Sequence, residues 1–317
     1  MSFNIIGTGS YLPEKVLTNA ELEKMVETND EWIKKRIGIS ERRIATHEST
    51  SFMGAEAAKE ALLMSGLSAS DIDLIICATI SSEDVCPSAA AMIQKQIGAN
   101  CPAFDISSAC SGFIFALETA RGFFEAGTAK NVLVVASERL SKLVDYTDRG
   151  TCIIFGDGAG AAVLTKGNGY KDSILKTVGG DDVIKIPSFA GASPFFEGEK
   201  NEPYMFMNGQ ETFKFAVESM CRDTEEVLKR NNLSSGDLKY VIPHQANTRI
   251  ISFAAKRLKM DLDKFYMNIE RFGNTGAASI PISLDELVRK GEIKKGDKLV
   301  LVAFGGGLSS GVCLIEW

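Results

Sequence analysis

Three side chains in the sequence have the chemistry needed to attack and stabilise an acyl group. Cys110 lies in "AFDISSACSGFIF", His244 in "VIPHQAN" and Asn274 in "FGNTGAASIP". A thiolate is a strong nucleophile, and histidine and asparagine nitrogens stabilise negative charge that develops on an oxygen. Each residue also has a structural interpretation: a small core residue, a satisfied buried histidine and a helix cap.

The position of Cys110 favours the catalytic interpretation. It stands where an apolar, strand-like run gives way to a helical run that begins near Ser111, with Phe113, Leu117 and Phe124 on one side. The free N–H groups and the dipole of that helix face residue 110, which favours thiolate over thiol. Small neighbouring residues leave room for a carbonyl to approach. We therefore predict that Cys110 is a nucleophile.

The other cysteines indicate neither a metal site nor a disulfide framework. The closest pairs among the seven cysteines are nine positions apart, which excludes CxxC spacing, and an odd count argues against paired disulfides. Cys77, Cys152 and Cys313 lie in apolar runs that predict strands, where cysteine acts as a small hydrophobe. We expect no bound metal.

The same order of elements occurs twice along the chain. Residues 66–81, "GLSASDIDLIICATIS", align without gaps with residues 232–247, "NLSSGDLKYVIPHQAN", at an offset of 166. Both halves end in a glycine-rich turn and a last strand, "FGDGAGAAVL" and "FGGGLSSGVCLIEW". Alternating helices and near-continuous apolar strands indicate parallel-rich sheets covered by helices. We therefore predict an α/β protein of two similar halves, 1–167 and 168–317.

The duplication predicts that the three candidate residues meet. At the offset of 166, Cys110 corresponds to position 276, two residues after Asn274, so both occupy matching corners between a strand and a helix. His244 follows the first repeated strand of the second half. In open α/β sheets, ligands bind beyond the carboxyl ends of strands. We expect one shared site there.

Composition narrows the classes of partner. The 35 basic and 41 acidic residues give a formal charge of −6, which predicts no general attraction to nucleic acid or to an anionic membrane. The first residues, "MSFNIIGTGSYLPEK", lack the regions of a signal peptide, and every apolar run is shorter than a membrane span. We expect a cytoplasmic protein.

Five motifs together resemble the β-ketoacyl-acyl carrier protein synthase III family: "SSACSGF", "FGDGAGAAVL", "PHQAN", "FGNTGAASIP" and "AFGGGLSSG". The resemblance covers nearly the whole chain and includes "TNDEWIKKRIGISERR" near its amino end. It implies the thiolase fold, with duplicated βα halves in a five-layer αβαβα sandwich, usually as a homodimer. It also implies a catalytic triad of Cys110, His244 and Asn274 that starts type II fatty acid synthesis.

The resemblance implies a two-step reaction without a cofactor, in which acyl-coenzyme A is a substrate. The acyl group moves to Cys110, and malonyl-acyl carrier protein then loses carbon dioxide and condenses with it to give a 3-oxoacyl product. His244 and Asn274 would stabilise the enolate, and the backbone N–H groups of Cys110 and Gly306 would form the oxyanion hole. For Gly306, a tight turn with positive φ is a compatible structural interpretation.

The resemblance also assigns binding residues. Thr28, Trp32 and Arg36 fall on one face of a predicted helix that ends at Gly38. The basic residues after His244 suit an acidic carrier protein, although a solvated helix face is the plainer interpretation. The implied coenzyme A set is Thr28, Trp32, Arg36, Arg149, Gly209 and Asn247, and the implied carrier-protein set is Lys214, Arg249, Lys256 and Arg257.

One departure concerns the acyl pocket. Many family members carry phenylalanine before the proline of a "PS" motif, as a wall of the pocket across the dimer, whereas this chain reads "EDVCPSAA" with Cys86. Without an aromatic ring there, we expect a deeper pocket that admits longer or branched acyl groups.

The sequence disfavours two related classes of enzyme and leaves three other functions open. A degradative thiolase needs a second cysteine in its last glycine loop, which "AFGGGLSSG" lacks, and elongating synthases use a second histidine where this chain has Asn274. A condensing enzyme of secondary metabolism with the same triad, a cysteine hydrolase and a noncatalytic acyl-binding protein stay open as alternatives.

Overall fold

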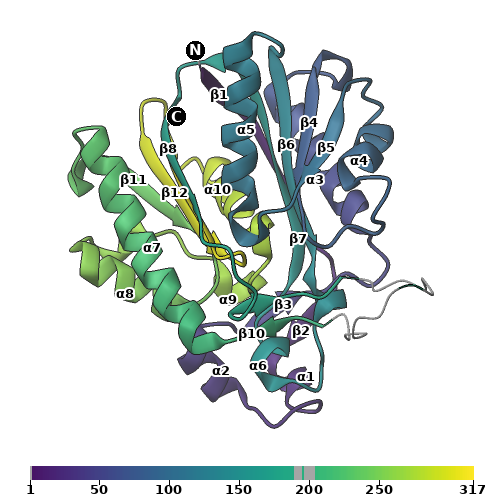
Figure 1. Ribbon diagram of the computed structural model, residues 1–317, viewed down its shortest axis with the longest axis vertical. Coiled ribbons are helices and arrows are strands. Elements are labelled where there is room, and N and C mark those ends of the chain that lie inside the picture. Colours follow the sequence, from purple (N-terminus) through teal and green to yellow (C-terminus); the bar gives the residue numbers. More distant parts are fainter. Residues whose placement is uncertain (1, 189–194, 196–203) are drawn as a thin grey trace.

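The computed structural model describes residues 2–188, 195 and 204–317. Its framework is two main sheets, of five and four strands, which lie side by side (Figure 1). The first sheet has the order β1 (Ser2–Tyr11), β7 (Asp157–Gly167), β6 (Asn131–Arg139), β4 (Leu74–Ala78) and β5 (Ala103–Ile106). The second has the order β11 (Leu238–Pro243), β12 (Lys298–Gly305), β13 (Ser309–Glu316) and β8 (Tyr170–Thr177).

Helices complete a sandwich of five layers, as the resemblance implies (Figure 1). One outer layer is α3 (Thr50–Ser65) and α4 (Ala89–Ile97), the middle layer is α5 (Gly112–Ala126) and α10 (Ser279–Arg289), and the other outer layer is α7 (Gly209–Arg230) and α8 (Thr248–Leu258). Separate apolar cores fill the spaces between layers. On β4, for example, Ile76 joins the middle core while Ile75 and Cys77 join the outer one.

Short elements surround the ends of the sheets near the middle layer. They are β2 (Val16–Thr18), α1 (Asn19–Leu22), α2 (Asp30–Ile37), β3 (Glu41–Arg43), α6 (Arg149–Cys152), β9 (Ile184–Lys185), β10 (Phe206–Met207) and α9 (Ile269–Phe272). A further apolar cluster holds these elements together and includes Leu22, Ile33 and Ile153. Within the described residues, no helix combines the length and the apolar character needed to cross a membrane.

Helix boundaries follow capping chemistry that the sequence displays. Ser49 and Ser88 cap α3 and α4 by accepting backbone N–H bonds, and both helices end at glycines in the left-handed conformation, Gly66 and Gly98. Glycine adopts that conformation without steric cost, so it ends helices efficiently. α5 ends in the same way at Gly127.

The direction of the strands differs from the prediction of parallel-rich sheets. Only β4 with β5, β4 with β6, and β11 with β12 pair in parallel among the main-sheet neighbours, and the other pairs are antiparallel. Both sheets are covered on two faces, so their strands are apolar throughout whichever way their neighbours run. The apolar composition of the strands therefore indicates that they are buried, but it does not indicate their direction. The prediction of parallel-rich sheets was wrong.

Each sheet is built from one side of the predicted boundary, since β7 ends at Gly167 and β8 begins at Tyr170. The two halves share the middle core, and their independence as folding units stays a prediction. Cys77 and Cys313 lie in strands as expected, but Cys152 ends the short helix α6, so the strand predicted around it was wrong. A buried apolar run of that length fits either element.

Candidate active site

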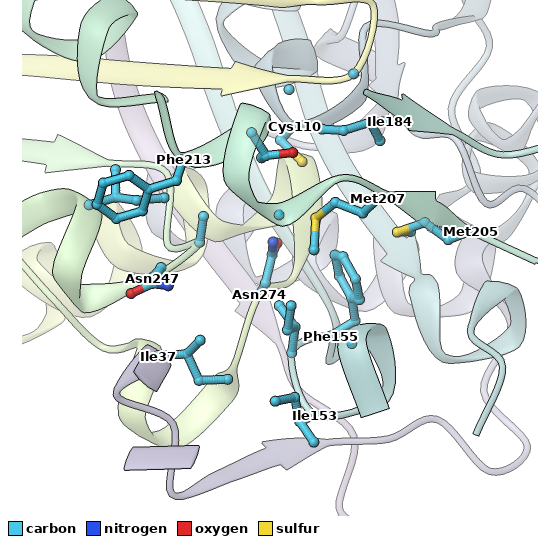
Figure 2. A pocket seen from close by; sticks show the side chains of 18 of the residues that line it. Ile37, Cys110, Ile153, Phe155, Ile184, Met205, Met207, Phe213, Asn247 and Asn274 are labelled. Carbon is cyan, nitrogen blue, oxygen red and sulfur yellow. The ribbon is translucent and has the colours of Figure 1, made fainter. Parts of the chain in front are cut away.

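A cavity of about 970 Å³ opens between the ends of the two sheets and contains all three candidate side chains. Cys110 comes from the turn between β5 and α5, His244 from the end of β11, and Asn274 from the segment before α10. Figure 2 shows Cys110, Asn274 and Asn247 around this space. The structure thus brings together residues that are up to 164 positions apart in the sequence.

The backbone at Cys110 is held in an uncommon conformation. Ala109 has a φ of 44°, in the left-handed region that residues with a Cβ rarely adopt. The hydroxyl of Ser111 donates to the carbonyl of Ser108 at 2.8 Å and lies 2.8 Å from the hydroxyl of Ser309. These contacts tie the first turn of α5 to the start of β13, so both halves of the chain position the thiol.

The Cys110 thiol is protonated at neutral pH, contrary to the expectation of a resting thiolate. Burial raises its pKa to about 12, and the nearby Glu138 carboxylate adds to the increase. The helix N-terminus is present as expected, but the loss of solvation is the largest influence on the pKa of this thiol. The predicted nucleophilic role therefore requires the Cys110 thiol to lose its proton.

His244 presents one ring nitrogen to the cavity. Its Nδ1 lies 2.8 Å from the hydroxyl of Ser279, which also accepts a bond from the Gln245 N–H at 3.3 Å. When Ser279 donates its proton to Nδ1, the imidazole hydrogen lies on Nε2, the nitrogen that is free to donate to a ligand. The ring also contacts the edge of Phe304, with 5.3 Å between ring centres. His244 is therefore a fixed, buried hydrogen-bond donor.

Asn274 combines the two roles that its position suggested. Its Oδ1 accepts the N–H of Gly276 at 2.9 Å, which caps the following turn. Its backbone is held on both sides, because its N–H donates to Ile154 at 2.9 Å and its carbonyl accepts from Gly156 at 3.0 Å. With Oδ1 occupied, the amide nitrogen is the group left to donate to a ligand in the cavity.

The glycine loop after β12 packs directly against Cys110. A Cβ added at Gly305 would lie 2.7 Å from the Cys110 nitrogen, a contact too short for any side chain. Gly306 lines the cavity but lacks positive φ, which belongs instead to Gly307 at 134°. The tight-turn interpretation of Gly306 was therefore off by one residue, whereas its proposed oxyanion N–H stays a prediction.

The predicted coenzyme A residues gather at the mouth of the same cavity, with one exception. Trp32, Arg36, Arg149, Gly209 and Asn247 all line it, and the Arg149 guanidinium lies 5.0 Å from the centre of the Trp32 ring. Thr28 does not line it. The helix begins only at Asp30, after the cap Asn29, so the helical spacing assumed for Thr28 was wrong.

The predicted carrier-protein residues divide into two groups. Lys214 and Arg249 line the cavity, and a smaller hollow of about 510 Å³ joins Arg249 to Trp32, Lys35 and Arg36. Lys256 and Arg257 are exposed further along α8. Lys214 also pairs with Glu211 at 2.7 Å.

Cys86 is exposed and does not line the cavity of the single chain. Its proposed place in the pocket needs a second copy and stays a prediction. Within the described part of the chain, no group of three His, Cys, Asp or Glu side chains is suited to a metal ion. The expectation of no bound metal stays a prediction too.

Two supporting residues were not identified from the sequence. Ser279 orients His244, and nothing in "GAASIP" distinguishes it from an ordinary helix residue. Glu138 is fully buried behind the site, bonded by the hydroxyl of Ser81, and burial raises its pKa to about 7. A carboxylate at the end of the apolar run "NVLVVASER" was the available signal for Glu138.

The ionisation of His244 makes stability depend on pH. Burial lowers its pKa to about 3, so between pH 6.5 and 3 the unfolded chain binds a proton that the folded chain does not. Stability therefore falls as the pH falls through this window. We expect the native chain to lose about 2 kcal/mol between pH 7.5 and pH 5 relative to His244→Ala. Urea unfolding of both proteins at the two pH values measures this, and an equal change in both would contradict it.

Comparison with known proteins identifies the family. A model of 3-oxoacyl-[acyl-carrier-protein (ACP)] synthase III matches residues 104–182, and a model of its C-terminal part matches residues 228–317. The β-ketoacyl-[acyl-carrier-protein] synthase III of Clostridium acetobutylicum is 47% identical, over 100% of this chain and 99% of its own. That of Caldanaerobacter subterraneus is 50% identical, over 99% and 97%. The chain belongs to the 3-oxoacyl-[acyl-carrier-protein] synthase III family.

Solved structures of the synthase III family agree with the fold. The crystal structure of the Aquifex aeolicus protein matches with a TM-score of 0.92 and 45% identity, over 100% of both chains. The resemblance and the thiolase fold expected from the sequence are thereby confirmed. The first matched range contains Cys110, and the second contains His244 and Asn274.

Proposed function

We propose that this chain is a β-ketoacyl-acyl carrier protein synthase III that transfers an acyl group from acyl-coenzyme A to Cys110 and condenses it with malonyl-acyl carrier protein. The observation that carries this function is the single cavity that joins Cys110, His244 and Asn274 to the cationic mouth around Arg36 and Arg149. Family membership supports the same conclusion, since the curated relatives bear this name.

In the first step, the Cys110 sulfur attacks the thioester carbonyl of acyl-coenzyme A. A tetrahedral oxyanion forms, for which the backbone N–H groups of Cys110 and Gly306 are the proposed donors. The carbon–sulfur bond to coenzyme A then breaks, and the thiol proton of Cys110 ends on the departing coenzyme A sulfur. One thioester replaces another, so the acyl group stays reactive.

In the second step, malonyl-acyl carrier protein loses carbon dioxide, and its electron pair moves onto the thioester oxygen as an enolate. Nε2 of His244 and the amide nitrogen of Asn274 donate hydrogen bonds to that oxygen. The electron pair returns to carbon, which attacks the acyl group and expels Cys110 as a thiolate. Cys110 takes a proton from solvent, and 3-oxoacyl-acyl carrier protein leaves. No cofactor enters this scheme.

Neutral His244 suits the enolate step. Burial lowers its pKa to about 3, so the imidazole donates a hydrogen bond without carrying a charge in the apolar cavity. An imidazolium would give its proton to the carbanion and produce the simple acetyl thioester without condensation. This protonation state supports carbon–carbon bond formation over loss of the malonyl group.

A basic surface beside the mouth suits the acidic carrier protein. Arg249, Lys256 and Arg257 lie exposed on α8, and Lys214 lies nearby on α7. Phe253 is 52% exposed between Arg249 and Arg257 on the same helix, so the basic stripe includes an apolar contact. We propose this face as the docking surface for malonyl-acyl carrier protein.

Charge reversal on this face tests the docking surface. We expect Lys256→Glu/Arg257→Glu to raise the KM for malonyl-acyl carrier protein by about 10-fold, because oppositely charged rim residues steer association. Acylation by acyl-coenzyme A should stay within about twofold, since both side chains lie outside the cavity lining. Lys59→Glu/Lys95→Glu, at exposed positions on α3 and α4, is the charge-matched control. Equal loss in both half-reactions would contradict the assignment.

A homodimer in the cytoplasm is also proposed. β5 is an edge strand of the first sheet, and the segment before α4 exposes Val85, at 95%, and Cys86. An unpaired edge and an exposed apolar residue are features that a second copy would cover. A reactive thiol and coenzyme A esters support an intracellular, reducing location.

The dimer gives Cys86 its proposed role in the acyl pocket. We expect Cys86→Phe to lower kcat/KM for octanoyl-coenzyme A by about 10-fold and to leave acetyl-coenzyme A within about twofold, because an added ring fills space that only the longer chain needs. Val85→Phe, one position away, is the control. An unchanged chain preference would show that the pocket is formed elsewhere.

Intact mass after incubation with acyl-coenzyme A esters, from acetyl to octanoyl and branched, tests the function. We expect one acyl adduct, discharged by malonyl-acyl carrier protein into a 3-oxoacyl product. Loss of the adduct to water would indicate a hydrolase, and bound ester without an adduct would indicate a noncatalytic binder. Discharge only by an acceptor other than malonyl-acyl carrier protein would favour secondary metabolism.

A further inference from the structure

A fully buried arginine lies behind the site. Arg42, in β3, has 0% exposure, and its guanidinium donates to neutral oxygens only: the carbonyl of Leu17 at 3.1 Å, Oδ1 of Asn19 at 2.9 Å and the carbonyl of Ile153 at 2.6 Å. No ion pair joins it to a carboxylate among the described residues. A buried cation without a counter-charge stabilises a fold poorly, so another reason for its presence is needed.

The oxygen that receives the shortest of these bonds belongs to the segment that holds Asn274. Ile153 begins residues 153–156, and two members of this segment bond the Asn274 backbone. Ile154 accepts its N–H at 2.9 Å, and Gly156 donates to its carbonyl at 3.0 Å. Arg42 thus bonds the first residue of a segment that hydrogen-bonds both the N–H and the carbonyl of Asn274.

The stem of Arg42 makes a second contact with the same region. A Cβ added at Gly273, the residue before Asn274, would lie 3.1 Å from Cβ of Arg42, and one added at Gly156 would lie at the same distance. The Cβ of Arg42 therefore lies against the backbone of both glycines, including Gly273, which has a φ of 65°.

We propose that Arg42 is the positioning residue for Asn274, holding the carbonyl of Ile153 and the backbone of Gly273 so that the Asn274 amide faces the enolate. This inference rests on the proposed function, in which Asn274 acts on the malonyl group. It requires that loss of Arg42 impairs the step that uses Asn274 and spares the step that does not.

Separate rates for Cys110 acylation and for malonyl-acyl carrier protein decarboxylation distinguish the positioning of Asn274 from a general structural role of Arg42. Asn274 donates to the enolate of the decarboxylation step, whereas acylation of Cys110 relies on other donors. A variant that merely unfolds in part loses both rates in proportion to the folded fraction. Arg42 bonds Asn19, and Asn19 donates to Asp30 at 2.9 Å, at the start of the helix that carries Trp32. Acylation is therefore measured at saturating acyl-coenzyme A, so that a change in coenzyme A binding does not alter the measured rate.

The variants are Arg42→Met, which removes every donor, and Arg42→Lys, which keeps the charge and one donor. We expect Arg42→Met to slow malonyl-acyl carrier protein decarboxylation by about 10-fold to 100-fold, less than the ~10²–10³ lost with a whole donor. Arg42→Lys should be intermediate, with Cys110 acylation within about twofold for both. Arg43→Met is the matched control, because Arg43 is adjacent on β3 and donates to Pro13 instead.

A double-variant cycle with Asn274→Ala decides the mechanism. If Arg42 acts through Asn274, Arg42→Met/Asn274→Ala will decarboxylate within about twofold of Asn274→Ala alone. Multiplicative losses, or equal loss of acylation and decarboxylation in Arg42→Met, would overturn the inference. An unchanged rate in Asn274→Ala alone would instead overturn the role of Asn274 in the proposed function. If Arg42→Met does not fold, Arg42→Lys takes its place in the same cycle.

Discussion

Replacing Cys110 with serine will abolish the acyl adduct and lower the condensation rate by on the order of 10⁶-fold, the scale of losing a covalent nucleophile. The hydroxyl has nearly the volume of the thiol, so the turn at Ala109 and the Ser111 contact with Ser309 should persist. The chemistry is lost because an alcohol is a far weaker nucleophile in a cavity that already raises the thiol pKa to about 12. Intact mass and product formation measure the two effects.

Cys101→Ser is the matched control for this change. Cys101 is also partly buried and its pKa is also raised by burial, but it lies before β5 and outside the cavity. It should keep both the adduct and the rate. An adduct on the Cys110→Ser variant, or its loss in Cys101→Ser, would show that the nucleophile has been assigned to the wrong residue.

Exchanging Asn274 for aspartate gives the second large effect. The carboxylate keeps an oxygen for the Gly276 N–H, so the turn before α10 retains its cap. The donor aimed at the enolate is lost, and a negative charge takes its place. We expect malonyl-acyl carrier protein decarboxylation to fall by about 10²–10³-fold or more, because removing one such donor already costs that much.

Acylation of Cys110 distinguishes this effect from misfolding. It should change by less than about threefold in Asn274→Asp, since the first step does not use the Asn274 amide. Asn29→Asp is the control for the same chemical change at a helix cap, because Asn29 also accepts a backbone N–H, that of Trp32 at 2.8 Å. Equal loss of acylation and decarboxylation would contradict the assignment of Asn274 to the enolate.

The repeat in the sequence predicted two similar halves with strands at matching positions, and the family resemblance supplied the five-layer arrangement. The stretches around Leu74–Ala78 and Leu238–Pro243 align at a fixed offset, and they became β4 and β11, the strands that precede the middle layer of each half. Apolar runs are local signals, and they located these two strands correctly. They carried no information on strand direction, because direction depends on how distant segments pair. The antiparallel pairs of both sheets were therefore not predicted.

The errors at individual residues have the same origin. Thr28 has helical spacing from Trp32, yet Asn29 caps the helix first because its side chain reaches the Trp32 N–H. Cys152 lies in a run that reads as a strand, and the packing of α6 against its neighbours made it helical. In both cases a local pattern had two solutions, and the contacts of the folded chain selected one.

The sequence by itself predicted which residues would carry the chemistry: Cys110 at a helix start, His244 after a strand and Asn274 before a helix. Its motifs were specific enough to identify the family. Only the tertiary structure decided the ionisation of these side chains and the neighbouring residues that orient them. The Cys110 thiol is protonated and His244 is neutral because both are desolvated in a cavity built from both halves. Segments more than thirty residues apart in the chain determine the solvation of the site and the contacts of Arg42 and Ser279 that orient it. A local sequence pattern does not contain this information.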